Sequence, residues 1–291
     1  MDIRAVLVGL AFAFVWSSAF TSARIIVADA SPLAALTLRF AISGLLGVAI
    51  ARAMGQSWHL TRAQWRATII FGVLQNAVYL GLNFVAMQTI QASVAAIIAS
   101  TMPLLVAMAS WFLMGERLRP LGIAGLIAGV IGVGLIMGAR ITEGVDPVGL
   151  VLCVIGVIAL TIATLSVRGA TSGGNFLMIV GLQMLVGSAA LGVATLALET
   201  PHFNPNWRLA AAFVYTTLVP GLAATVMWFW LVNRIGATRA ATFHFLNPFF
   251  GVATAAVLLS EALGPQDLIG VAIITAGILA VQLSRQPRNR E

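Results

Sequence analysis

One apolar segment carries polar side chains on a single stripe. Asn76, Tyr79 and Asn83 are spaced by three and four residues within an otherwise apolar run. Residues at this spacing share one face of a helix. Amide and phenol groups can hold the amino or carboxyl group of a small solute, or they can hydrogen-bond to a neighbouring helix. We expect this stripe to line a solute cavity, with an interhelical hydrogen-bond seam as the alternative.

Aromatic residues and one histidine are further candidates for the wall of such a cavity. Trp16 lies too deep in its apolar run for an interfacial tryptophan, and two serines follow it. Tyr215 and His244 also lie inside apolar runs. A cavity with aromatic walls and few polar groups suits amphipathic solutes. We expect Trp16, Tyr215 and His244 to bind substrate; the alternatives are packing or, for His244, a proton-carrying group.

Two prolines occupy equivalent places in separate apolar runs. Pro103 and Pro248 are both followed, 13 residues later, by a glutamate. A proline within a helix removes one backbone hydrogen bond and kinks the helix. We expect the pair to act as gating hinges, with static kinks as the alternative.

Three charged residues are expected to be structural. Arg39 lies inside an apolar run, where a charge costs about 3 kcal/mol or more and usually faces the protein interior. We expect it to contact helix carbonyls; the alternative is a partner for a substrate carboxylate. Glu116 and Glu261 end their runs, and we expect each to accept hydrogen bonds from the amides that open the next helix.

No constellation for catalysis or metal binding is visible in the sequence. The single cysteine, Cys153, lies in an apolar run, and no histidine–cysteine spacing fits a metal site. Every aspartate and glutamate falls at or near the end of an apolar run. We therefore expect no enzyme, metal or cofactor, and no carboxylate proton relay. Facilitated diffusion is favoured over proton exchange through His244.

The elements that must position these side chains are membrane helices. The 291 residues are 60% hydrophobic and 9% charged, against roughly 25% charged in soluble domains. Each membrane helix needs about 20 apolar residues. Ten runs qualify, the first being a retained span rather than a signal peptide: 4–27, 32–51, 67–88, 91–113, 120–139, 147–168, 175–198, 208–232, 237–259 and 265–284.

The basic residues are all arginine and are distributed unevenly between the loops. If the N-terminus is cytoplasmic, twelve arginines lie on that side and three on the other, with Arg39 inside a span. This bias predicts that both termini are cytoplasmic. Since the arginines lie in short loops and not on one solvated face, we expect no nucleic-acid partner. The expected location is a bacterial inner membrane, crossed many times.

The chain contains an internal repeat. Residues 91–136 and 236–281 match at a shift of 145, which superposes Pro103 on Pro248 and Glu116 on Glu261. Two similar halves with five spans each must lie in opposite orientation across the membrane. The sequence therefore predicts an all-α membrane protein of ten helices in two inverted repeats, residues 1–140 and 147–285, with a cytoplasmic tail at 286–291.

Glycines on the fifth run are spaced for close helix packing. Gly125 and Gly129, then Gly134 and Gly138, are each four residues apart. Small residues at this spacing let membrane helices approach closely. The contact is either within one chain or between two copies; we expect a monomer.

These segments resemble the drug/metabolite transporter superfamily, in its ten-helix EamA-type exporter branch. The resemblance is carried by Pro103, Gly115-Glu116-Arg117-Leu118 and Pro120, and by VWSSAF (15–20), LTLRF (36–40) and NFVAMQTIQASVAAI (83–97). The second copy departs from the pattern at Ser260 and Ala262. The resemblance implies export of small metabolites, with exporters of aromatic and other neutral amino acids as the most similar group.

The expected function is therefore export of small neutral or zwitterionic metabolites, amino acids among them, by alternating access. The expected partners are a small-molecule substrate and the lipid bilayer. One alternative is a multidrug or lipophilic-cation exporter, although a cation favours a buried counter-charge that the spans lack. The alternative of another class is a membrane-embedded enzyme that modifies lipid.

Overall fold

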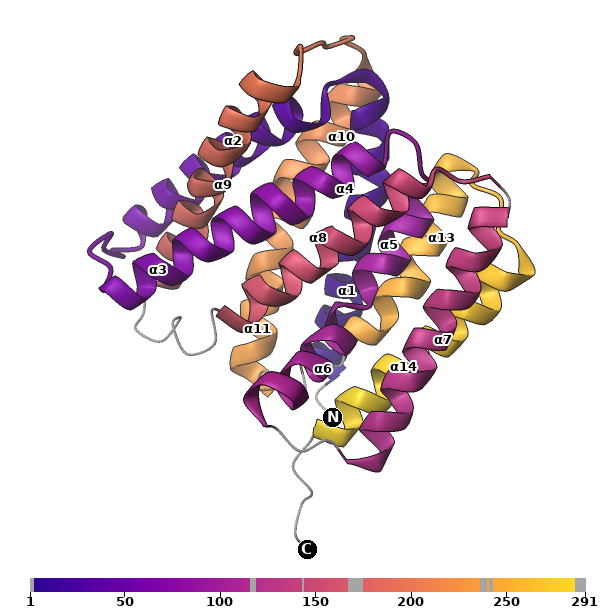
Figure 1. The fold of residues 1–291 in the computed structure, drawn as a ribbon. Coiled ribbons are helices and arrows are strands. Elements are labelled where there is room, and N and C mark those ends of the chain that lie inside the picture. The colour runs from indigo at the N-terminus through magenta and orange to yellow at the C-terminus, as the bar shows by residue number, and fades with distance from the viewer. Residues whose placement is uncertain are drawn as a thin grey trace, which may run out of the picture. The chain divides into compact units, whose positions relative to one another are not determined.

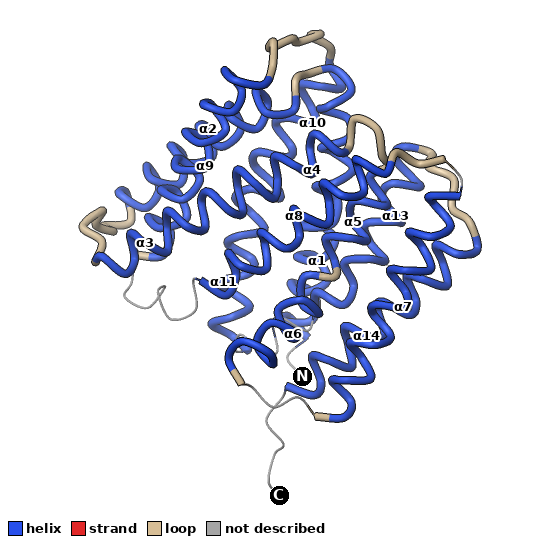
Figure 2. The backbone as a smooth tube through the Cα atoms, viewed as in Figure 1, coloured by secondary structure: helices blue, strands red, loops and turns tan. Residues whose placement is uncertain are grey.

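The structure is a computed structural model that describes residues 3–115, 119–142, 144–166, 175–235, 240 and 243–285. Helices make up nearly all of this part of the chain (Figure 1). Figure 2 shows helices joined by short loops, and no strand is present among the described residues. Their one extended pairing is an isolated antiparallel bridge between Ala30 and Phe203.

The first half of the chain forms α1 (Ile3–Asp29), α2 (Pro32–Ala53), α3 (Arg62–Phe71), the π-helix η1 (Gly72–Tyr79), α4 (Leu80–Ala86), α5 (Ala92–Ser100), α6 (Met102–Met114) and α7 (Pro120–Thr142). The second half forms α8 (Pro147–Ser166), α9 (Phe176–Leu198), α10 (Trp207–Leu218), the π-helix η2 (Val219–Ala223), α11 (Ala224–Ile235), the 3₁₀-helix η3 (Phe243–Leu246), α13 (Asn247–Leu259) and α14 (Pro265–Arg285).

The helices match the predicted spans. Within the described residues, nine helical segments are long and apolar enough to cross a membrane, and Phe243–Leu259 is a shorter apolar segment. These ten segments correspond in order to the ten predicted runs. The prediction of an all-α membrane protein with ten spans is confirmed.

The chain divides into two compact units, and each unit takes segments from both halves of the sequence. Unit 1 comprises the described residues of Met1–Thr21, Ile90–Leu150 and Ala223–Glu291; unit 2 comprises those of Ser22–Thr89 and Val151–Leu222. The helices α5, α7, α13 and α14 therefore belong to unit 1, and α2 and α9 belong to unit 2. The repeats 1–140 and 147–285 are defined by sequence similarity. Each compact unit contains segments of both repeats.

Reciprocal glycine contacts join α7 and α14 within unit 1. A Cβ on Gly125 would lie 2.6 Å from the carbonyl oxygen of Gly277, and a Cβ on Gly277 would lie 2.6 Å from the carbonyl oxygen of Gly125. Gly132 and Gly270 are related in the same way at 3.0 Å. Contacts between 125 and 277 and between 132 and 270 require antiparallel helices. Since Gly125 corresponds to Gly270 in the repeat, equivalent helices run in opposite directions, as an inverted repeat demands.

The helices α2 and α9 of unit 2 pair in the same antiparallel manner. Gly44 and Gly181 approach closely, since a Cβ on either would lie 3.0 Å from the carbonyl oxygen of the other. Nearer the opposite end, the hydroxyl groups of Thr37 and Thr195 lie 3.3 Å apart. A second pair of equivalent spans is thus also inverted. Figure 1 shows α2 beside α9 and α7 beside α14.

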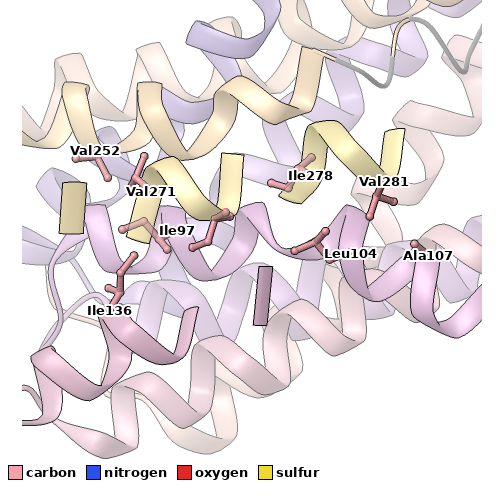
Figure 3. Packing of buried hydrophobic residues seen from close by; sticks show 9 residues of the cluster. Ile97, Leu104, Ala107, Ile136, Val252, Val271, Ile278 and Val281 are labelled. Atoms are coloured by element: carbon pink, nitrogen blue, oxygen red, sulfur yellow. The ribbon is translucent and has the colours of Figure 1, made fainter. Parts of the chain in front are cut away.

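The glycine spacing on α7 serves packing within the chain. Gly125, Gly129 and Gly132 all face neighbouring atoms of unit 1, whereas a Cβ on Gly134 or Gly138 would meet nothing within 4 Å. The apolar cluster around this contact takes side chains from α5, α6, α7, α13 and α14 (Figure 3): Ile97, Leu104, Ala107, Ile136, Val252, Val271, Ile274, Ile278 and Val281. Close packing between two copies through Gly125 and Gly129 is therefore excluded by the fold.

Both prolines of the repeat lie at the start of a helix that follows a break. Pro103 is in the first turn of α6, after the chain leaves α5 at Thr101. Pro248 is in the first turn of α13, directly after the 3₁₀ turn η3. The amide of Thr101 hydrogen-bonds to the carbonyls of Ile98 and Ala99, which closes the end of α5. The breaks suit either a hinge or a static bend, and the hinge role stays a prediction.

Glu261 joins the two copies of the repeat. Its carboxylate accepts hydrogen bonds from the amides of Ala92 (2.7 Å) and Ser93 (3.0 Å), which open α5. We predicted the amides of the following helix, α14. At the start of α14 the amides of Asp267 and Leu268 donate instead to the carbonyl of Gly264, at 3.1 and 3.4 Å, and the carboxylate of Asp267 accepts from the amide of Gly264 at 2.8 Å. Glu116 lies outside the described residues.

The same device occurs in unit 2. Glu199 follows α9, and its two carboxylate oxygens accept from the amides of Leu33 (3.0 Å) and Ala34 (3.1 Å), which open α2. A carboxylate at a helix N-terminus satisfies amides that have no partner within the helix and interacts favourably with the helix dipole. Each unit thus has a helix whose first amides are capped by a carboxylate distant in sequence.

We expect Glu261→Gln to lower the free energy of unfolding by about 1–2 kcal/mol, because the amide side chain keeps at most one acceptor and no charge. Thermal unfolding of the detergent-purified protein measures the loss. Asp146→Asn is the control: Asp146 accepts from the nearby amide of Val148 in an exposed bond, and its loss should lower the melting temperature less. Equal melting temperatures for Glu261→Gln and wild type would refute the expectation.

Candidate functional site

An aromatic cluster surrounds His244 in unit 1. The ring of Phe12 lies 5.4 Å from the imidazole, centroid to centroid, in an edge-to-face arrangement at 88°. The ring of Trp228 lies 5.2 Å away, and that of Trp16 lies 6.4 Å away at 89°. Phe12 also contacts both tryptophans, at 5.8 Å for Trp16 and 5.2 Å for Trp228. The cluster draws on α1, α11 and η3, so both copies of the repeat contribute.

The polar centre of this cluster is the pair His244 and Asn247. The amide Nδ2 of Asn247 lies 3.0 Å from Nδ1 of His244. With Nδ2 as the donor, Nδ1 is the acceptor, and a neutral imidazole then carries its proton on Nε2. The other atom of the amide, Oδ1, is buried and has no hydrogen-bond partner among the described residues. A buried acceptor without a partner marks a place where a donor group can bind.

Local breaks in the helices position this pair. The 3₁₀ turn η3 carries His244, and α13 begins at Asn247. Packing fixes the turn, because Phe243 lies against Gly9 so closely that a Cβ there would overlap its ring. The hydroxyl of Ser17 donates to the backbone carbonyl of Asn247 at 3.2 Å and ties α1 to the start of α13. Ser18, the next residue, donates to the carbonyl of Val15 within α1.

The chemistry of the cluster is that of a neutral, aromatic recognition site. Trp16, Trp228 and His244 are only partly buried as whole residues. The faces of aromatic rings can stack on apolar or aromatic groups and attract cations. His244 and Asn247 supply a neutral donor and acceptors, and no carboxylate of the described residues takes part. Nor do those residues hold a group of three or more potential metal ligands.

The polar stripe of the third span lies in unit 2 and is engaged in packing. Asn76 is 2% exposed and donates through Nδ2 to the carbonyl of Gln183 on α9 at 3.0 Å. Asn83 is 1% exposed and donates to the carbonyl of Tyr79 at 2.8 Å. The thiol of Cys153 lies 3.5 Å from Oδ1 of Asn83. The contacts of Asn76 with Gln183 and of Asn83 with Cys153 join neighbouring helices, whereas the bond from Asn83 to Tyr79 lies within one span. Solute binding by Asn76, Tyr79 and Asn83 stays a prediction.

The stripe coincides with irregular helix geometry. Asn76 and Tyr79 lie in η1, and η2 occupies the equivalent place in the second copy. π-Helical turns are rare and often occur at functional sites. A shift of 145 places Gly221 opposite Asn76, so the second copy has no side chain where the first has an amide.

The remaining predicted residues also lie in unit 2. Tyr215 is partly buried on α10. Arg39 is buried on α2, and its guanidinium carbon lies 5.0 Å from the centroid of the Phe40 ring. The six predicted cavity residues are therefore distributed over both units. Trp16 and His244 lie together in unit 1, and Asn76, Tyr79, Asn83 and Tyr215 lie in unit 2.

Sequence reasoning missed Phe12, Trp228 and Asn247 as members of the cluster. One signal was present for Trp228: it is the counterpart of Asn83 at the repeat shift of 145. Applying the repeat to the polar stripe would therefore have identified it. No pattern in the sequence singles out Phe12, which is one of 15 phenylalanines.

Several proteins with similar sequence are named as transporters. The EamA-like transporter family matches residues 3–138 and again residues 147–283. The inner membrane transporter YedA of Escherichia coli K12, itself uncharacterized, is 26% identical over 93% of this chain and 88% of its own length. The uncharacterized transporter YvbV of Bacillus subtilis is 23% identical over 91% and 87%. A solved crystal structure at 22% identity covers 97% of this chain and 99% of its own, with a TM-score of 0.69.

Proposed function

Because the chain belongs to the EamA-like transporter family, we propose that this multi-pass membrane transporter exports small neutral or zwitterionic metabolites, including aromatic amino acids. The observation that carries the proposal is the cluster of Phe12, Trp16 and Trp228 around the His244–Asn247 pair. Aromatic rings around a few neutral polar groups suit a solute with an apolar side chain and a polar head.

The proposed mechanism is alternating access. Inverted repeats can exchange conformations so that a site opens first to one side and then to the other. The antiparallel pairing of α7 with α14 and of α2 with α9 supports such an exchange. In this proposal the helix breaks before Pro103 and Pro248 act as the hinges.

The proposed location is a bacterial inner membrane with both termini in the cytoplasm. The arginine distribution supports this orientation. YedA is named as an inner membrane transporter. The protein works without catalysis in this proposal, since its sequence offers no nucleophile with an adjacent base.

Export of lipophilic cations is the second candidate function. The aromatic faces beside His244 favour it, because cations bind over indole and phenyl rings. The lack of a carboxylate deep within any apolar run disfavours it, since a cation in a membrane interior gains most from a counter-charge.

Uptake into proteoliposomes tests the proposed function. We expect labelled phenylalanine and other neutral amino acids to enter liposomes that contain the protein faster than protein-free liposomes. A cationic dye serves as the competing substrate. Accumulation of the dye without transport of any amino acid would replace the proposal with the second candidate.

We propose facilitated diffusion as the coupling mode, because the spans lack the carboxylates of a proton relay. Phenylalanine uptake is therefore expected to be the same with and without a pH gradient across the liposome. Its initial rate at both conditions is the measurement. His244→Gln is the matched variant: a gradient-driven rate in the wild type that this variant abolishes would instead establish proton exchange through His244.

A further inference from the structure

Arg39 is a buried cation without a protein partner at its Nε. The side chain is 7% exposed, and Nε has no hydrogen-bond partner among the described residues. The guanidinium carbon lies 5.0 Å from the centroid of the neighbouring Phe40 ring. This ring contact stabilises a cation but accepts none of its N–H groups. The guanidinium and its five N–H donors thus lie in the interior of unit 2. The N–H at Nε donates no hydrogen bond to any described residue.

The guanidinium lies against the irregular turn η2. A Cβ on Gly221 would lie 3.8 Å from Nη2 of Arg39 and 3.5 Å from the hydroxyl oxygen of Ser43. Ser43 is one helical turn from Arg39 on α2 and donates to the carbonyl of Thr217 at 3.3 Å. Because position 221 has no side chain, the guanidinium faces backbone atoms of η2 at this point.

The carboxylates of unit 2 lie elsewhere. The segments that form this unit contain two, Asp29 and Glu199. Both oxygens of Glu199 bind the amides of Leu33 and Ala34, roughly 9 Å from Arg39 along the axis of α2 at 1.5 Å per residue. Asp29 is the last residue of α1, one residue before the bridge between Ala30 and Phe203.

We propose that Arg39 is a residue of unit 2 that binds the carboxylate group of a small solute. A buried charge without a counter-ion is unfavourable, and a bound anion removes that cost. The planar guanidinium offers paired N–H donors that match the two oxygens of a carboxylate. The proposal rests on the proposed function and narrows its substrate class to zwitterionic solutes with a free carboxylate, such as amino acids.

Binding of benzoate and benzamide to the detergent-purified protein tests the proposal. The two probes have the same ring and nearly the same shape, and only benzoate has the charge. We expect wild type to bind benzoate at least tenfold more tightly, as titrated by the rise in melting temperature at constant ionic strength. Arg39→Gln should weaken benzoate at least tenfold and leave benzamide unchanged. Arg39→Lys should be intermediate, because a lysine lacks the planar pair of donors.

Arg24→Gln is the matched control. Arg24 also belongs to unit 2, but its Nη1 donates to the carbonyl of Met87. Its replacement removes one positive charge and should leave benzoate binding unchanged. Equal affinity of wild type for the two probes, or an unchanged benzoate affinity in Arg39→Gln, would overturn the proposal. If Arg39→Gln does not fold, the proposal is tested by the affinities of wild type for benzoate and benzamide and by the benzoate affinity of Arg39→Lys.

Transport assays separate this proposal from the proposed function. If phenylalanine and phenylalaninamide are transported at equal rates, and Arg39→Gln changes neither rate, the proposed carboxylate site is wrong and the proposed export function still stands. Conversely, if benzoate binding depends on Arg39 but the protein transports no amino acid, the carboxylate site is supported and the proposed substrate class is wrong.

Discussion

Gly277→Val is expected to lower the free energy of unfolding by about 3 kcal/mol or more. A Cβ at this position would lie 2.6 Å from the carbonyl oxygen of Gly125 and 3.0 Å from the amide nitrogen of Gly129. Both atoms belong to the backbone of α7, so no side-chain rotation relieves the clash and the helices must separate. Separation opens the apolar cluster that α14 shares with α7. Thermal unfolding and the monodisperse fraction in detergent measure the loss.

Gly134→Val is the control for this prediction. It places the same side chain on α7, where a Cβ meets no atom within 4 Å. The variant should melt at nearly the wild-type temperature, because valine in lipid is well tolerated. If the variants at 277 and 134 melt at the same temperature, the close contact of α7 and α14 does not exist.

Trp228→Ala is expected to reduce the initial rate of phenylalanine transport at least tenfold. Trp228 contacts both Phe12 and His244, and its removal deletes the indole from one side of the aromatic cluster. Stacking on a substrate ring is lost together with the surface that holds the imidazole. Trp228→Phe should retain most of the rate, since a smaller ring preserves the stacking. Transport per folded molecule in proteoliposomes is the measurement.

The control for Trp228 is Trp207→Ala. Trp207 is 76% exposed at the start of α10, beside Arg208, and belongs to unit 2, whereas the cluster belongs to unit 1. Its loss should leave the rate within about twofold of wild type. A Trp228→Ala protein that folds and transports at the wild-type rate would show that the aromatic cluster serves packing alone.

The spans and the inverted repeat could be predicted because lipid imposes a strict pattern. In lipid, the backbone N–H and C=O groups of a helix must form hydrogen bonds within the helix, and the helix must cross the hydrocarbon core. These two requirements fix its length and its apolar composition. The repeat was visible because Pro103 and Pro248, and Gly125 and Gly270, keep their types at a constant shift. The pairing of Gly125 with Gly277 was not visible, because the partner of a glycine depends on how two helices cross and leaves no mark in either sequence alone.

The candidate site was only partly predictable for the same reason. The depth of Trp16 and the isolation of His244 identified both, and the structure brings them together. The side chains of Asn76 and Asn83 were also predicted to line the cavity, because they are polar groups inside an apolar run. In the structure their side-chain amides donate hydrogen bonds to backbone carbonyls. A polar stripe does not reveal whether its partner is a solute or a carbonyl group. Likewise, nothing near Glu261 in sequence indicates that its carboxylate binds α5, 168 to 169 residues away.

The reciprocity of the glycine contacts bears on how such a chain could arise. Gly125 meets Gly277 as Gly132 meets Gly270, and each pair is the image of the other under exchange of the copies. A single-copy ancestor carrying only the first pair of glycines could have formed both contacts between two identical molecules inserted upside down to each other. Fusion of two such genes would preserve the contacts and free each half to diverge, which explains why His244 and Asn247 have no counterpart of the same type in the first half.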